Sequence, residues 1–180
     1  TWINMREEPF IYINDVPFVI RDADHPFQNI KAFIGVDSGR LESIEDNLAR
    51  DIRNEAASNG GLIVIHVEDE KGGLVPSLVA AGSVRTPREL FEAFGCESAS
   101  DPLVVLYRRV PVSSFQFQFA NEEFMDQFVE MLRDLPQSSA VVVSCGMGIG
   151  RVTVGMIICY MIRAFGKRVV VNQTSGGIDA

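Results

Sequence analysis

The stretch "VVVSCGMGIGRVTVGMIICYMI", residues 141–162, decides the fold of this chain. Small and apolar residues run into Cys145, three glycines alternate with apolar residues behind it, and Arg151 then opens a long apolar pattern. The residues before the cysteine predict a buried strand, and those after the arginine predict a helix. The sequence therefore places a thiol and a guanidinium at the two ends of a glycine-rich turn between a strand and a helix.

The turn has the composition of an anion-binding loop. Its glycines let successive backbone N–H groups point inward at a helix N-terminus, where the helix dipole favours negative charge. Arg151 adds a planar fork that can bind two oxygens of one phosphate. We expect the same positive field to favour the thiolate form of Cys145. The predicted phosphate-binding residues of the turn are Gly146, Met147, Gly148, Ile149, Gly150 and Arg151.

Other glycine-rich motifs do not fit this spacing. A Walker A loop needs a lysine followed by serine or threonine, whereas Arg151 is followed by Val152 in this chain. A dinucleotide-binding fingerprint would place a third glycine at the position of Arg151. The remaining alternative is that Cys145 is a buried structural thiol in a tight turn, although such a turn has no need of an arginine.

The rest of the chain alternates between strand-like and helical patterns. Asn14 and Asp15 join two short strand-like runs and predict an N-terminal β-hairpin. Helical periodicity and stop signals predict helices over residues 38–59, 86–94 and 121–135 and after Arg151, and apolar runs predict strands over residues 62–67, 102–108 and 139–145. Apolar strands separated by helices are typical of a parallel sheet. We expect an α/β fold with a mostly parallel central sheet and helices on both faces.

Polar residues gather at the ends of three predicted strands. They are His66, Glu68 and Asp69 after the first, Tyr107, Arg108 and Arg109 at the second, and Cys145 to Arg151 after the last. Ligands of open parallel sheets bind beyond the carboxyl ends of the strands. We expect Arg109 to extend the positive pocket, although a surface ion pair would also explain it. His66 has no metal-binding partners nearby in the sequence and is interpreted as a structural histidine.

Composition restricts the class of protein. The chain has 180 residues, 47% of them hydrophobic, which predicts a single globular domain. Its formal net charge of −8 argues against nucleic-acid binding through bulk charge, and no apolar run is long enough to predict a transmembrane segment. Three cysteines at unrelated spacings match neither a disulfide framework nor a zinc site. We therefore expect a cytoplasmic protein with free thiols.

Several further segments accompany the Cys-x5-Arg loop: "INMREEP", "YINDVPFVIRD", "HPFQNIK", "LIVIHVEDE", "LVPSLV", "RTPRELFEAF" and "YRRVPVS". Together with "SCGMGIGRVTVGM" they resemble, in order, the paladin and phytase-like branch of the protein tyrosine phosphatase superfamily. The resemblance implies a phosphatase-like fold whose active members hydrolyse inositol phosphates, phosphoinositides or phosphoproteins through a phosphocysteine, without a metal or other cofactor. It also implies that residues 1–180 form one phosphatase-like domain, a piece of a larger paladin-like protein with further domains.

Carried over to this chain, the resemblance implies that Cys145 is the nucleophile. It also implies that Arg151 and the N–H groups of the loop bind the phosphoryl group during its transfer. Two positions depart from the family pattern. Ser114 stands where active relatives usually have the aspartate that protonates the leaving oxygen, and Val152 stands where many have a serine or threonine. Glu122, Glu123 and Asp126 are nearby substitutes for the acid, but their positions are typical of a solvated first helical turn.

Two functions follow from this pattern. The first is a phosphate-binding domain with impaired catalysis, a pseudophosphatase that binds phosphorylated inositol, lipid or protein ligands. The second is an active cysteine-dependent phosphatase on the same classes of ligand. Both require the loop from Cys145 to Arg151, and they differ in whether a general acid is present.

Overall fold

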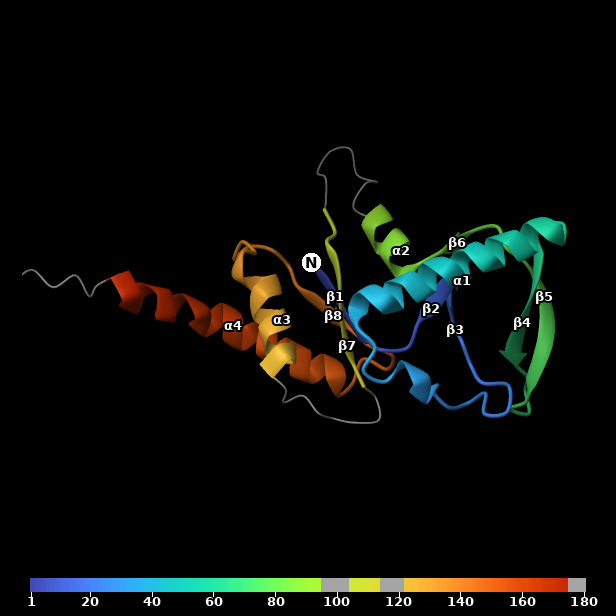
Figure 1. Ribbon diagram of the computed structural model, residues 1–180, viewed down its shortest axis with the longest axis horizontal. Helices are drawn as coiled ribbons and strands as arrows, with labels where there is room; N and C mark the ends of the chain where they lie inside the picture. Colours follow the sequence, from blue (N-terminus) through green and yellow to red (C-terminus); the bar gives the residue numbers. More distant parts are fainter. Residues whose placement is uncertain (95–103, 114–121, 175–180) are drawn as a thin grey trace, which may run out of the picture. The chain divides into compact units, whose positions relative to one another are not determined.

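The computed structural model describes residues 1–94, 104–113 and 122–174, with no side-chain description for 122, 123 and 166–174 (Figure 1). The chain divides into two compact units. One unit contains Thr1–Arg6 and the chain from Tyr107 onward, and the other contains Glu7–Leu106. No helix in these ranges is both long enough and apolar enough to cross a membrane.

The first unit is built on a three-stranded parallel sheet in the order β7, β1, β8. Its strands are β1 (Trp2–Arg6), β7 (Tyr107–Val112) and β8 (Val142–Ser144). In the register of the sheet, Asn4 of β1 lies opposite Arg109 of β7 and Ser144 of β8. Because all three strands run in the same direction, their carboxyl ends meet at one edge of the sheet.

Two helices pack on this sheet. They are α3 (Glu122–Arg133) and α4 (Arg151–Thr174). The helix was predicted from the periodicity of Phe124, Phe128, Leu132 and Leu135; the first three are buried on α3, and Leu135 follows the end of the helix and packs partly buried against the same core. The core that they form with the strands and with α4 consists of Ile3, Met5, Val110, Val112, Phe124, Phe128, Leu132, Ile158 and Cys159. The interpretation of the 121–135 pattern as an amphipathic helix is therefore confirmed.

A β-bulge lies at the carboxyl end of β1. The pairing runs from Asn4 opposite Arg109 to Arg6 opposite Val112, so that β7 has one more residue than β1 between these pairs. One of the two intervening residues of β7 is Pro111, which has no N–H group to give to a regular ladder. A bulge bends the strand that carries the extra residue, which is β7 in this pair.

The second unit begins with the predicted N-terminal β-hairpin. Strands β2 (Phe10–Ile13) and β3 (Val16–Val19) pair antiparallel, and β6 (Val84–Arg85) pairs with the other side of β2. Asn14 and Asp15 at the turn have φ of 50° and 65°, the left-handed backbone that a tight two-residue hairpin turn requires. The hairpin prediction is confirmed, and the preceding run "WINMR" forms β1 in the other unit.

Capping residues fix the ends of the helices in this unit. A short 3-10 helix, η1 (Lys31–Phe33), precedes α1 (Ser38–Ser58), whose first turn is capped by the Asp37 side chain. The Gly61 N–H donates to the Ala56 carbonyl with Gly60 and Gly61 at positive φ, which ends α1. Helix α2 (Pro87–Ala93) begins with the predicted capping box of Thr86 and Glu89.

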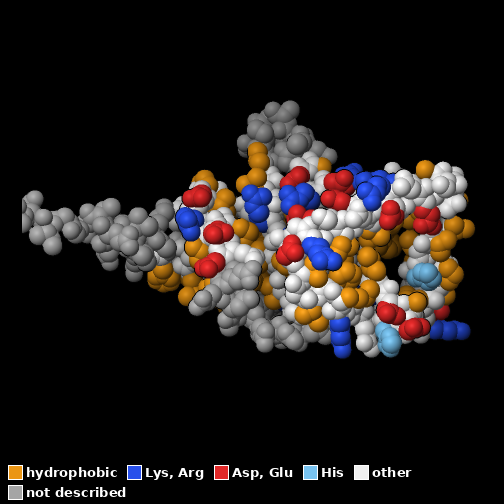
Figure 2. Space-filling view, in the orientation of Figure 1, with side chains coloured by type: hydrophobic (Ala, Val, Ile, Leu, Met, Phe, Trp, Pro, Cys, Tyr) orange, Lys and Arg blue, Asp and Glu red, His pale blue; other side chains and the backbone are white. Residues whose placement is uncertain are grey.

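The prediction of a parallel strand over residues 62–67 is wrong. Among the strands that the structure describes, β4 (Leu62–Glu68) pairs with β5 (Leu74–Ala80) alone, in an antiparallel hairpin. Asp69 closes the hairpin turn, since its side chain accepts hydrogen bonds from the Lys71 and Gly73 N–H groups. The hairpin packs Ile63 into the core of this unit but leaves Val64 52% and Leu78 69% exposed, and apolar side chains gather over β4 and β5 in Figure 2.

The strand predicted over residues 102–108 is displaced along the chain. Residues 104–106 have no regular structure and Val104 is 71% exposed, whereas β7 begins at Tyr107. The first residue of β7 lies opposite Trp2, and the buried Tyr107 hydroxyl accepts a hydrogen bond from the Asn4 side chain. A strand forms where a partner strand is available, and that position does not coincide with the most apolar residues.

Gly155 sets the distance between α4 and the sheet, which generates a prediction on stability. A Cβ at this position would lie 2.5 Å from Met5 Sδ and 3.0 Å from Val143 Cγ1, and Met5 is fully buried. We expect Gly155→Ala to destabilise the protein by about 1–2 kcal/mol in chemical denaturation, because the overlap outweighs the better helix propensity of alanine. Gly39→Ala, in α1, is the control, since the added methyl group meets only ordinary contacts there. An unchanged or higher stability of Gly155→Ala would contradict this account of the packing.

Candidate functional site

The loop from Cys145 to Gly150 connects β8 directly to α4. Gly148 and Gly150 have φ of 72° and 69°, the left-handed region in which glycine is strongly favoured. The Val154 N–H donates to the Gly150 carbonyl and starts the helix, and the Cys145 thiol donates to the Ile149 carbonyl over 3.7 Å. The predicted strand, turn and helix are confirmed, and Cys145 stands at the point where β8 ends.

Arg151 joins this loop to the other two strands of the sheet. Its side chain is 8% exposed, and its Nη1 donates to the Val112 carbonyl over 2.8 Å and to the Met5 carbonyl over 3.5 Å. Its Nη2 lies 3.6 Å from the point that a Cβ on Gly146 would occupy. The guanidinium is therefore fixed against the loop by the carboxyl ends of β7 and β1.

Arg109 lies in the middle of β7 and is also buried, and its side chain reaches the carboxyl end of β1. Its Nε donates to the Arg6 carbonyl over 3.1 Å. The buried side chain of Asn4 accepts a hydrogen bond from the Arg6 N–H over 3.0 Å and donates to the Tyr107 hydroxyl over 2.8 Å. Arg109 and Asn4 thus hold the backbone of Arg6 from both sides. Phosphate binding by Arg109 remains a prediction.

Arg6 was not among the site residues predicted from the sequence. In the structure it ends β1, and its Nη1 lies 3.8 Å from the Cβ position of Gly146, beside the Arg151 guanidinium. A charged residue directly after the apolar run of β1 was the available signal. It was missed because the sequence pattern does not show that β1 lies beside β8, about 140 residues further along the chain.

Other residues from the sequence analysis are not part of this arrangement or cannot be placed in it. His66 and Glu68 lie on the antiparallel hairpin of the second unit, so the expectation that they follow a parallel strand is wrong. Arg108 is exposed, and its side chain donates to the Tyr107 carbonyl. Ser114 lies outside the described residues, as does Cys96, the third cysteine of the chain, and Asp126 is exposed on α3.

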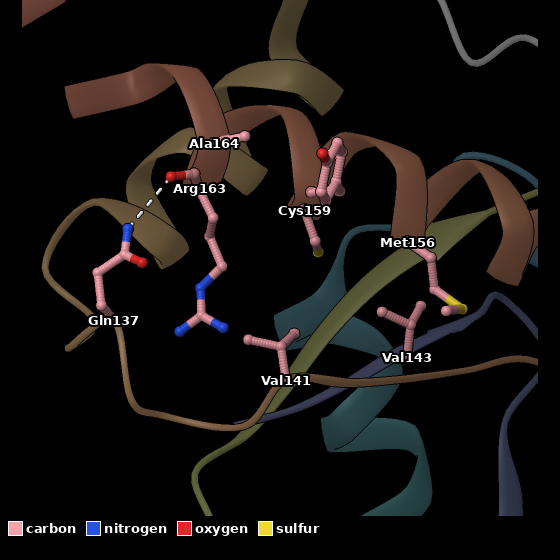
Figure 3. A pocket seen from close by; sticks show the side chains of 8 residues that line it. Gln137, Val141, Val143, Met156, Cys159, Arg163 and Ala164 are labelled. Carbon is pink, nitrogen blue, oxygen red and sulfur yellow. Dashed lines mark hydrogen bonds between the residues drawn. The ribbon is translucent and has the colours of Figure 1, made fainter. Parts of the chain in front are cut away.

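A separate hollow of about 370 Å³ lies between α4 and the chain that leads into β8 (Figure 3). It is lined by Gln137, Val141, Val143, Met156, Cys159, Tyr160, Arg163 and Ala164. Cys159 is buried at its base, and this burial raises the pKa of the Cys159 thiol to about 11. Neither Cys145 nor Arg151 lines the hollow, and its lining is mostly apolar. In the part of the chain that the structure describes, no three His, Cys, Asp or Glu side chains are arranged to hold a metal ion.

Comparison with known proteins identifies the family and the fold of the chain. The family model of PTP-like phytases, described by the words "Inositol hexakisphosphate", matches residues 3–163. Paladin from Xenopus tropicalis is 26% identical over 163 residues, which are 89% of this chain and 17% of that protein. The chain therefore spans about a sixth of the length of this curated relative.

Two solved structures share the fold. The PTP-like myo-inositol phosphatase from Mitsuokella multacida, solved in complex with myo-inositol-(1,3,4,5)-tetrakisphosphate, superposes with a TM-score of 0.64 at 17% identity, over 90% of this chain and 24% of that one. A PTP-like phytase from Bdellovibrio bacteriovorus gives a TM-score of 0.52 at 20% identity, over 89% of this chain and 49% of that one. The predicted phosphatase-like α/β fold is confirmed.

The two described cysteines are predicted to differ in reactivity toward a thiol reagent. Cys145 is partly exposed, whereas Cys159 is buried with a pKa of about 11, so that about one Cys159 thiol in a thousand is ionised at pH 8. In a Cys96→Ser background, we expect iodoacetamide at pH 8 to alkylate Cys145 within minutes and to leave Cys159 unmodified, as read by mass spectrometry of peptides. Both should react in denaturant. Equal labelling of the two cysteines in the folded protein would show that the core around Cys159 is open.

Proposed function

We propose that this chain, which belongs to the PTP-like phytase family, binds phosphate esters at the loop between Cys145 and Arg151. The observation that carries the proposal is the position of the Arg151 guanidinium, which is buried against the loop and held by backbone carbonyls of two strands. A buried charge that is fixed in this way is already in place when an anion arrives, so little of the binding energy is lost to ordering the side chain.

The loop supplies the remaining phosphate ligands. A phosphoryl group in the loop would accept hydrogen bonds from the backbone N–H groups of residues 146–151 and lie at the N-terminus of α4. Each charge-assisted hydrogen bond of this kind contributes about 1.5–3 kcal/mol. We place inositol phosphates first among the ligand classes, because the family model is described by inositol hexakisphosphate and the Mitsuokella multacida protein was solved with an inositol tetrakisphosphate. Phosphoinositides and phosphoproteins present the same phosphate ester chemistry.

We further propose that catalysis at this loop is impaired. In the reaction of the superfamily, the cysteine thiolate forms a bond to phosphorus while the ester P–O bond breaks, and the leaving oxygen takes a proton from a general acid. Ser114 stands at the acid position of the sequence and cannot supply that proton at neutral pH. Val152, buried at the start of α4, offers no hydroxyl to the Cys145 thiolate. An active phosphatase remains the alternative, and it would need an acid from another residue.

The organisation of the chain is part of the same proposal. We propose that residues 1–180 act as one phosphatase-like domain of a larger cytoplasmic protein. The family match runs through both compact units, and the chain covers only 17% of the length of Paladin. Both described cysteines are free thiols, as the cytoplasm would keep them.

The binding proposal predicts that phosphate affinity depends on the shape of the Arg151 side chain. We expect inositol hexakisphosphate to bind in isothermal titration calorimetry and Arg151→Lys to weaken this binding by about 10-fold or more, because lysine keeps the charge but loses the planar fork. Arg108→Lys is the matched control and should bind as the unmodified chain does, since Arg108 is exposed and lies outside the loop. A chain that does not bind the ligand, or binding that is insensitive to Arg151→Lys, would contradict the proposal.

Turnover is tested by phosphate release from inositol hexakisphosphate, a phosphoinositide and a phosphotyrosine peptide. We expect little or no release from the unmodified chain, and an increase of up to about 10²–10⁴-fold in Ser114→Asp, the range that a general acid typically contributes. Cys145→Ser should abolish release in both backgrounds and leave binding intact. Rapid release by the unmodified chain that disappears in Cys145→Ser would instead establish the active phosphatase.

A further inference from the structure

We infer that Arg6 is a second phosphate-binding guanidinium of this site, which contacts the phosphate adjacent to the one in the loop on a polyphosphorylated ligand. The inference rests on the proposed function, because it assigns the ligand preference of the same loop. Arg6 ends the central strand of the parallel sheet, at the edge where the loop begins. Arg109 and Arg151 are buried, whereas Arg6 is half-buried: its Nε is enclosed by the protein, and the part of the residue that remains exposed is open to a ligand.

The backbone around Arg6 is fixed more firmly than a strand end requires. Its N–H donates to the Asn4 side chain over 3.0 Å, and its carbonyl accepts from Arg109 Nε over 3.1 Å. Asn4 and Arg109 are 3% and 5% exposed, so two buried polar side chains are committed to this one residue. The register shift between Asn4 and Arg6 adds a residue to β7 and leaves β1 regular, so Arg6 follows Asn4 by two residues on the same strand. Such a network defines the direction of a side chain, which is what a binding residue needs.

The side chain of Arg6 shares its surroundings with Arg151. Arg6 Nη1 and Arg151 Nη2 lie 3.8 Å and 3.6 Å from the same point, the Cβ position that glycine leaves empty at residue 146. Both groups carry a positive charge, so an anionic group that binds near this point is attracted by both. Arg151 is tied to the carbonyl groups at the base of the loop, whereas Arg6 comes from the neighbouring strand at the Gly146 side of the loop.

In this geometry the two arginines bind different phosphates of one ligand. Arg151 belongs to the loop itself and binds any phosphate that occupies the loop. Arg6 lies to one side of the loop and binds a second phosphate of the same ligand. An inositol ring with phosphates on adjacent carbons presents such a pair. A guanidinium fork suits this role because it can bind two oxygens of the second group at once.

The test compares inositol monophosphate with inositol hexakisphosphate, by calorimetry, in the unmodified chain and in Arg6→Gln. We expect Arg6→Gln to weaken hexakisphosphate binding by about 10- to 100-fold, the equivalent of one charge-assisted bidentate contact, and monophosphate binding by less than about 3-fold. Arg6→Lys should recover part of the lost affinity because it restores the charge without the fork. Arg108→Gln removes the same charge from an exposed neighbouring position and should leave both affinities unchanged. Thermal unfolding of each variant shows whether the fold is retained, as we expect, since the backbone bonds of Arg6 do not involve its side chain.

The outcomes separate this inference from the function on which it rests. If the unmodified chain binds neither ligand, the proposed function fails. If it binds both and Arg151→Lys weakens both, but Arg6→Gln changes neither, the loop is a phosphate site and the role of Arg6 is overturned. Equal losses for the two ligands in Arg6→Gln would also overturn the inference, because Arg6 would then contact the phosphate in the loop or act through the fold.

Discussion

The hydrogen bond from Arg151 to the carbonyl of Val112 is the interaction on which the rest of the site depends. A guanidinium that is 8% exposed must have its N–H groups paired, because an unpaired buried charge costs several kcal/mol. Val112 is the last residue of β7, and Arg151 is the first residue of α4. The pairing therefore requires that α4 begin close to the point where β7 ends. The loop between β8 and α4 must then connect the end of β8 to that fixed start of the helix. The sheet, the helix and the loop are constrained by one side chain.

Close packing behind the loop imposes a second condition. Gly155 lets α4 approach Met5 and Val143 more closely than any residue with a Cβ would allow. The same helix carries Arg151 one turn earlier, so that its distance from the sheet sets how far the guanidinium reaches toward the strand ends. The chemistry at the edge of the sheet and the packing under the helix are therefore two parts of one arrangement, and neither could change without the other.

Local signals made much of the fold predictable. The Asn14–Asp15 turn, the capping box of Thr86 and Glu89, and the two glycines after α1 each act within a few residues, and each is found where the sequence placed it. The apolar run at residues 62–67 was assigned to the wrong kind of pairing, because an apolar run does not reveal whether its strand is parallel or antiparallel, or whether both of its faces are covered. Its partner turned out to be the next strand along the chain.

The candidate site shows the same limit. Cys145, the glycines and Arg151 form one contiguous motif, so the sequence alone indicated the loop. The burial of Arg109 and the position of Arg6 depend on which strands become neighbours, and a pattern of apolar residues does not contain that information. An apolar periodicity also gives no reason to expect an arginine and an asparagine inside a sheet, where their partners are a backbone carbonyl, a backbone N–H and a tyrosine hydroxyl.

The central position of β1 has a consequence for how the protein folds. Its Trp2 indole donates to Ser144 and its Asn4 side chain to Tyr107, contacts between residues that are 142 and 103 positions apart in the chain. Closing loops of this length costs conformational entropy before any contact compensates for it, and such non-local pairing slows folding. The hairpin of β2 and β3 and the hairpin of β4 and β5 join strands that are neighbours in the sequence, so they can form early. We therefore expect the edge that carries the loop to be completed last, when β1 pairs with β7 and β8.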